Sequence, residues 1–125
     1  MKKITGIRGA VCCENTKEEI TEYVCRMMNQ IIEMNKIKEK DIISIHFTIT
    51  NEITVLNPCT ALRKGNSIID ISNIALFCSQ EAQIEGGMKN VIRVLIHAYI
   101  KKNQKKHNVY LNGAEKLRPD YSENK

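Results

Sequence analysis

The spacing of hydrophobic and polar residues predicts a strand followed by one long helix. Residues 3–13 are short, β-branched and glycine-punctuated, which is typical of a strand that ends near Cys13. Thr16 and Glu19 then have the spacing of a capping box at a helix start. Asn35 and the polar run after it should end this helix. Its apolar residues recur at helical spacing and should pack on a sheet; they are Ile20, Val24, Met27, Met28, Ile31 and Ile32.

Residues 42–50 change to a period of two, which predicts a strand with one apolar and one polar face. The apolar row is Ile43, Ile45, Phe47 and Ile49, and the polar row is Ser44, His46, Thr48 and Thr50. Further along, Asn57 and Pro58 predict the cap and first turn of a short helix that runs to about Lys64. Gly65 should stop this helix.

Three more strands are predicted, over residues 74–79, 92–100 and 108–111, and together these elements indicate an α+β sheet with the long helix on one face. The other face of the sheet is then uncovered. It is also partly apolar, because Leu95 and Tyr99 lie opposite the main apolar row of their strand. Such a face indicates association, most often as a closed homo-oligomer.

Composition narrows the class of protein. With 125 residues, 42% hydrophobic and 26% charged, the chain can bury one ordinary core. We therefore treat residues 1–118 as a single domain and 119–125 as a polar C-terminal tail. No apolar run is long enough to span a membrane, and the N-terminus lacks the apolar segment of a signal peptide. We expect a cytoplasmic protein with no membrane partner.

Charge and cysteine usage argue against two further classes. The net charge of +5 comes from scattered lysines and a few arginines, and only 5% of residues are aromatic, which argues against nucleic-acid binding and leaves small anions as ligands. The five cysteines form no C-x-x-C pair, and the adjacent Cys12 and Cys13 point to opposite faces of a strand. We expect reduced thiols packed as small core residues, and no metal site.

The sequence contains no familiar motif for nucleophilic, phosphate-binding, zinc or dinucleotide chemistry. Its scarce arginines are more informative, because a guanidinium binds a carboxylate through two parallel hydrogen bonds. Arg8 lies in a glycine-flanked strand, and Arg93 lies between two apolar residues. For each of them, facing water from a two-sided strand is the alternative.

Six segments in chain order carry a more specific signal. They are Gly6-Ile7-Arg8-Gly9-Ala10, Cys78-Ser79-Gln80-Glu81, Gly86-Gly87-Met88-Lys89, Ile92-Arg93-Val94, Val109-Tyr110-Leu111 and Leu117-Arg118-Pro119-Asp120. In this order they resemble the small trimeric chorismate mutases of the AroH class over nearly the whole chain. The resemblance implies a mixed β-sheet with helices outside, three chains forming a pseudo-α/β barrel, and active sites in the clefts between neighbours.

The activity implied by the resemblance is that of an isomerase in phenylalanine and tyrosine biosynthesis. Its substrate, chorismate, would rearrange to prephenate in a unimolecular Claisen reaction that needs no nucleophile, general base, metal or cofactor. Two alternatives remain. One is a trimeric imine or enamine hydrolase, although the sequence shows no obvious water-activating group. The other is a weak or inactive trimeric module that binds an aromatic-pathway anion.

The resemblance assigns catalytic roles to three residues. Arg93 would contact the breaking ether oxygen and a carboxylate, and Arg8 would hold a carboxylate bidentately. Glu81 would accept a hydrogen bond from the ring hydroxyl. Taken singly, Glu81 also fits an exposed loop acid.

Four further residues would bind the substrate. Tyr110 would donate its hydroxyl in the region of Arg8, and Cys78 would lie near the ring hydroxyl. Arg63 would approach the ring carboxylate from the mouth of the cleft, and Leu117 with the tail would close over it. The structural alternatives are a half-buried strand aromatic for Tyr110, core packing for Cys78 and a solvated helix end for Arg63.

Three positions depart from the pattern of the family. They are Asn57, Thr60 and Phe77. By the resemblance they belong to the wall and rim of the pocket, so we expect altered substrate affinity before any loss of chemistry.

Overall fold

The computed structural model describes residues 1–117, which form a five-stranded sheet with two α-helices and two short 3-10 helices. The elements are β1 (Lys2–Cys12), α1 (Lys17–Met34), η1 (Glu39–Asp41), β2 (Ile42–Ile49), α2 (Pro58–Lys64), β3 (Ala75–Gln80), β4 (Val91–Lys101), β5 (Val109–Leu111) and η2 (Ala114–Lys116). All the strands and both α-helices predicted from the sequence are confirmed, with their ends shifted by about one residue. The predicted polar tail, 119–125, lies outside the described residues.

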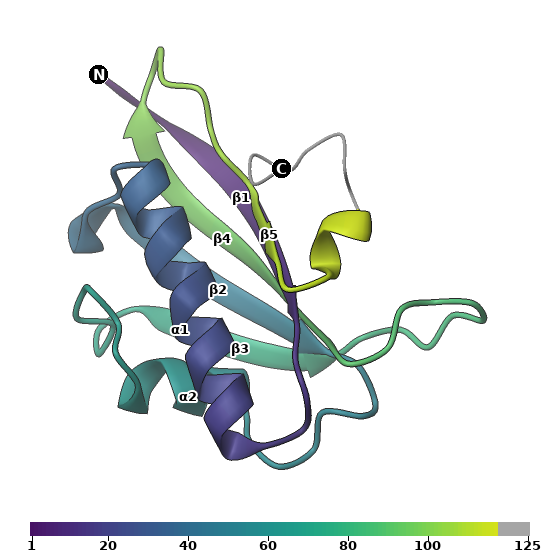
Figure 1. The fold of residues 1–125 in the computed structure, drawn as a ribbon. Helices are drawn as coiled ribbons and strands as arrows, with labels where there is room; N and C mark the ends of the chain where they lie inside the picture. Colours follow the sequence, from purple (N-terminus) through teal and green to yellow (C-terminus); the bar gives the residue numbers. More distant parts are fainter. Residues whose placement is uncertain (118–125) are drawn as a thin grey trace.

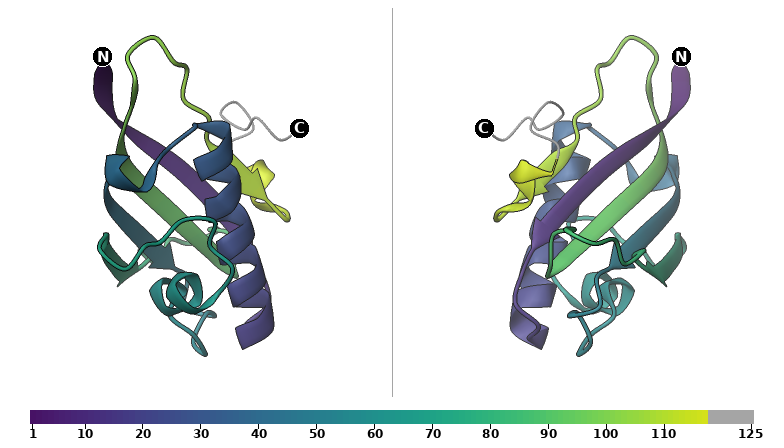
Figure 2. Two further views of the ribbon diagram at one scale, coloured as in Figure 1. Left: turned by 90° about the vertical axis from the view of Figure 1, so that its left-hand side faces the viewer. Right: turned by 90° about the vertical axis from the view of Figure 1, so that its right-hand side faces the viewer.

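The sheet is mixed and has one covered face. Its strand order is β3-β2-β4-β1-β5; β4 runs antiparallel to β1 and β2, while the β2–β3 and β1–β5 pairs are parallel. Both α-helices lie on the same side of the sheet (Figures 1 and 2). The opposite side, which carries neither α-helix and which we call the helix-free face, exposes Leu95 and Tyr99 as the alternation predicts.

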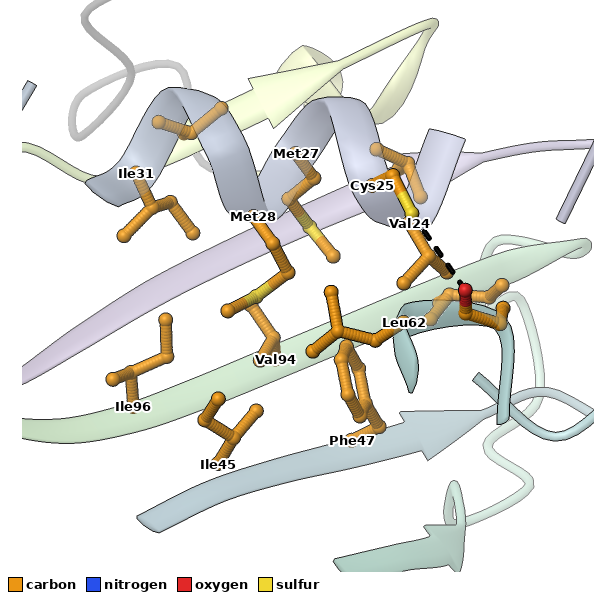
Figure 3. Packing of buried hydrophobic residues seen from close by; sticks show 14 of the residues in the cluster. Val24, Cys25, Met27, Met28, Ile31, Ile45, Phe47, Leu62, Val94 and Ile96 are labelled. Atoms are coloured by element: carbon orange, nitrogen blue, oxygen red, sulfur yellow. Dashed lines mark hydrogen bonds between the residues drawn. The ribbon is translucent and has the colours of Figure 1, made fainter. Parts of the chain in front are cut away.

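The core lies between α1 and the sheet (Figure 3). All six apolar residues predicted for the packed face of α1 are buried. They meet inward-facing residues of the central strands, among them Phe47 and Ile96, and Leu62 of α2 completes the layer. Each fully buried side chain of this size contributes ~1.5–3 kcal/mol. This packing holds the sheet rigid and leaves its other face available for function.

The predicted orientation of one side chain in β2 is wrong. Ile43 was expected in the apolar row, but it is 43% exposed and Ile42 is buried in its place. The cause is a shift in the pairing of β2 with β4 between Ile42 and Ser44. A one-residue shift moves a side chain to the other face of the sheet.

The ends of the helices are capped partly as predicted. Thr16 Oγ1 accepts from the backbone N–H of Glu19, at 3.1 Å. The predicted reciprocal hydrogen bond, from the Thr16 N–H to the Glu19 carboxylate, is wrong. The Thr16 N–H donates to the Glu14 carbonyl, and Glu19 Oε1 accepts from the Glu14 N–H. Asn57 caps α2 by accepting from the Cys59 N–H at 2.8 Å, which gives this family departure a structural role.

Gly65 stops α2 for a different reason from the one predicted. Its φ of −92° is open to any residue, so no left-handed conformation is involved. A Cβ atom here would instead lie 2.4 Å from Cys25 Sγ and 2.7 Å from the Ala61 carbonyl oxygen. Glycine therefore permits the close approach of α1 and α2, in which the Cys25 thiol donates to the same carbonyl (Figure 3).

Candidate active site

Two rows of facing residues cross the helix-free face, because strand register brings distant positions together. The first row runs through Ser79, Thr48, Arg93, Ala10 and Tyr110, from β3 to β5. It places the arginine of β4 at the centre of the sheet. Side chains at paired positions of neighbouring strands share one face and lie within contact distance.

The second row lies beside the first. It runs through Phe77, His46, Leu95 and Arg8. The Phe77 and His46 rings meet edge to face, with their centroids 5.4 Å apart, and His46 Nε2 is 2.9 Å from Ser79 Oγ. Arg8 therefore lies one row from Arg93, on the same face.

A cleft of about 370 Å³ opens on this face. Its lining residues are Arg8, Gly9, His46, Thr48, Glu81, Arg93, Val94, Leu95 and Tyr110. It thus brings together Arg8, Glu81, Arg93 and Tyr110, all four of which were candidate site residues. Two guanidiniums and a phenol at one concave surface can bind an anion with more than one carboxylate.

Glu81 and Arg93 form an ion pair inside the cleft. Glu81 follows the last residue of β3, where its backbone N–H donates to the Ile49 carbonyl at 2.8 Å. Its Oε1 lies 3.2 Å from Arg93 Nε and also accepts from the Thr48 hydroxyl, at 2.5 Å. Arg93 Nε is shielded from solvent but makes no hydrogen bond of good geometry within residues 1–117. The pair is held in place while the side chain of Arg93 stays 41% exposed.

A second cavity, of about 540 Å³, also has both residues of this ion pair in its lining. It is lined by residues 50–52, by residues 81–89, and by Arg93. Gly86, with a φ of +80°, makes the turn of this loop. Glu81 and Arg93 therefore form a wall shared by two hollows.

Tyr110 is 3% exposed and belongs to a small apolar cluster on the helix-free face. The cluster also contains Ala10, Val91 and Ala114, and Leu117 packs against it. The 3-10 helix η2 thus covers the β5 end of this face. Leu117 lies next to the Tyr110 cluster without lining the cleft itself.

Arg63 and Cys78 do not line the cleft of the described chain. Arg63 lies on the exposed surface of α2 and donates to Thr60 Oγ1 at 3.3 Å. The Cys78 side chain points to the core face of β3, where it packs beside the helices. Burial, with a smaller contribution from Cys59, raises the pKa of the Cys78 thiol to about 11.

Two polar lining residues, His46 and Thr48, were not among the candidates. The signal that could have found them was the polar row of the second strand, which places both on the face opposite the core. What the sequence pattern lacks is the cross-strand register that sets Thr48 beside Arg93.

Comparisons with known proteins identify the family of this chain. The family model for chorismate mutase type I matches residues 4–121. The chain is 33% identical over 122 residues to chorismate mutase AroH of Bacillus subtilis (strain 168), covering 95% of this chain and 93% of that protein. It is also similar to the solved structure of a chorismate mutase from Clostridium thermocellum, with a TM-score of 0.78 and 33% identity over 90% of this chain and 99% of that one.

The fold and these matches define an isomerase of aromatic amino-acid biosynthesis. The chain belongs to the chorismate mutase type I family, and its activity is that of a chorismate mutase. Within residues 1–117, no helix is both long and apolar enough to cross a membrane.

Proposed function

We propose that the cleft around the Glu81–Arg93 pair binds chorismate and catalyses its rearrangement to prephenate. The reaction breaks one C–O bond and forms one C–C bond within a single molecule, so no atom, proton or electron has to be supplied. The site has two tasks. It selects the folded conformer of the enolpyruvyl group, and it stabilises negative charge that grows on the ether oxygen.

Arg93 is the cation for the ether oxygen in this proposal. It is fixed at the base by its strand and by Glu81, and its exposed portion faces the cleft. A donor held in place before the reaction costs no reorganisation when charge develops, which makes such groups effective in the transition state. The single observation that carries the proposal is this anchored guanidinium in a cleft that also contains Arg8 and Tyr110.

The remaining cleft residues bind and orient the substrate. Arg8 holds one carboxylate of the dianion through its two-pronged guanidinium, and Tyr110 donates its hydroxyl in the same region. Glu81 has four lone-pair positions, of which the Thr48 hydroxyl takes one, so its carboxylate can also accept from the ring hydroxyl of chorismate.

Assembly as a homotrimer completes the site in this proposal. The helix-free face is partly apolar, with Phe77 at 66% exposure on the edge strand β3, and a neighbouring chain is the partner that would cover it. Arg63 and the β3 segment around Cys78 would then reach the cleft of an adjacent chain. Leu117 would bring the tail toward the same cleft. We also propose a cytoplasmic location, on family resemblance alone.

The proposal is tested with purified protein, chorismate and no added cofactor. Turnover is followed by the loss of chorismate absorbance, and the product is identified as prephenate. Tight binding of chorismate without turnover contradicts the catalytic proposal. Light scattering tests the assembly separately: a mass three times the 14.3 kDa of the chain is expected, and a monomer would remove the shared cleft.

A further inference from the structure

The Glu81 carboxylate is the least constrained part of the ion pair. Glu81 lies one residue beyond β3, at the start of the segment that leads to Gly86-Gly87. A glutamate side chain has several rotatable bonds, and ordering it costs ~1.5–2 kcal/mol of conformational entropy. Without a second contact, its carboxylate can leave Arg93 by rotation alone.

Thr48 provides that contact from an inner strand of the sheet. It lies in β2, which pairs with β3 on one side and β4 on the other, and its register partners are Ser79 and Arg93. Its β-branched side chain has restricted rotamers. The hydroxyl donates to Glu81 Oε1, the same oxygen that lies 3.2 Å from Arg93 Nε. One hydroxyl therefore connects β2 to the ion pair.

We propose that Thr48 is a positioning residue that acts through Glu81 on Arg93. This inference rests on the proposed roles of Glu81 and Arg93 and adds a third group that neither family pattern nor strand alternation assigns. The hydroxyl holds the carboxylate beside Nε, and the carboxylate in turn fixes the orientation of the guanidinium plane. The effect belongs to the transition state, because the charge on the ether oxygen exists only there.

The test compares Thr48→Val, which removes the hydroxyl and keeps the branched shape, with Thr48→Ser, which keeps the hydroxyl. Steady-state kinetics with chorismate should show kcat lowered about tenfold in Thr48→Val, equivalent to the ~1.4 kcal/mol of one hydrogen bond to a charged group. KM should change less than kcat. Thr48→Ser should stay within about twofold of the wild type. Thr48→Ala, which lacks both the hydroxyl and the branch, is measured alongside in case valine is not tolerated.

A double-mutant cycle separates positioning from a structural role. In a Glu81→Ala background there is no carboxylate to hold, so adding Thr48→Val should lower kcat no further. Ser44→Ala is the matched control. It removes a hydroxyl from the same face of β2 that lies 3.4 Å from His97 Nδ1 and not against Glu81. It should leave kcat unchanged.

Three kinetic results would overturn the inference: no loss in Thr48→Val, an equal loss in Thr48→Ser, or the same loss with and without Glu81. If the wild-type protein does not turn over chorismate, the proposed function fails, and crystal structures of the wild type and Thr48→Val decide the inference on their own. A Glu81 carboxylate displaced from Arg93 in the variant supports it. An unchanged ion pair overturns it.

Discussion

Gly9 lies directly beneath Ile31 of α1. A Cβ atom at position 9 would be 2.9 Å from Ile31 Cδ1, 3.1 Å from Met27 Sδ and 3.0 Å from the carbonyl oxygen of Val109. In β1, the Arg8 side chain therefore faces the cleft on one side of the sheet, while the backbone of the next residue, Gly9, contacts α1 on the other side. This contact sets how closely α1 packs against the strand whose opposite face carries Arg8.

Replacing Gly9 with alanine should destabilise the protein by ~1–3 kcal/mol, because the extra methyl group overpacks a filled core and meets a backbone atom that cannot move alone. Urea unfolding at fixed protein concentration measures the change. Gly6→Ala is the matched control in the same strand, since its Cβ would make only an ordinary contact, 3.5 Å from Leu95 Cδ1. Equal effects of the two substitutions would contradict this account.

Local pattern explains why so much of the fold could be predicted. Helical spacing identified the buried face of α1, and strand alternation placed Arg93 opposite the core. Ile43 could not be placed, because its exposure depends on a shift in pairing between two strands. Long-range pairing is decided by the packed sheet as a whole and leaves no mark in a short window of sequence.

The site shows the same limit. Family resemblance predicted site roles for Arg8, Glu81, Arg93 and Tyr110, and in the structure all four line one cleft. The contact of Thr48 with Glu81 joins positions 33 apart in sequence, so no spacing rule could identify it. The buried Asn35 is similar: it was predicted only as a helix end, yet its amide also binds the backbone of the loop before β5.

Asp41 should make stability depend on pH. Lys2 Nζ lies 2.6 Å from its Oδ1, and this hydrogen bond holds the pKa of the buried carboxyl below its usual range. A pKa lower in the folded chain than in the unfolded one stabilises the fold above about pH 4, and the contribution is lost as pH falls through the folded pKa. Urea unfolding should therefore show the wild type losing its advantage over Asp41→Asn as the pH falls below about 4.

Lys2→Met provides the control for this prediction. It removes the ammonium that lowers the pKa of Asp41, so the pH-dependent advantage over Asp41→Asn should shrink when both are compared in the Lys2→Met background. A constant difference between wild type and Asp41→Asn across the acid range would show that the ion pair does not carry the effect.

The Cys78 thiol should be dispensable for turnover, because its side chain faces the core while the cleft lies on the opposite face. Cys78→Ala should keep kcat within about threefold of the wild type, since it removes packing and no group in contact with substrate. With its pKa raised to about 11, the thiol should also react slowly with iodoacetamide at pH 8. A large loss of kcat in a folded Cys78→Ala protein would instead give the thiol a direct role.

Arg93 should show the largest effect of any single substitution. Arg93→Ala should lower kcat by ~10²-fold or more, the scale for removing one donor to charge in a transition state. Arg93→Lys should restore only part of the rate, because a compact ammonium cannot bridge two oxygens as the planar guanidinium does. Arg26→Ala is the matched control, since Arg26 is paired with Glu22 on the exposed surface of α1. If Arg93→Ala stayed within a few fold of the wild type while folding normally, the cation at the ether oxygen would have to be sought elsewhere, and Arg8 would be the first candidate because it shares the cleft.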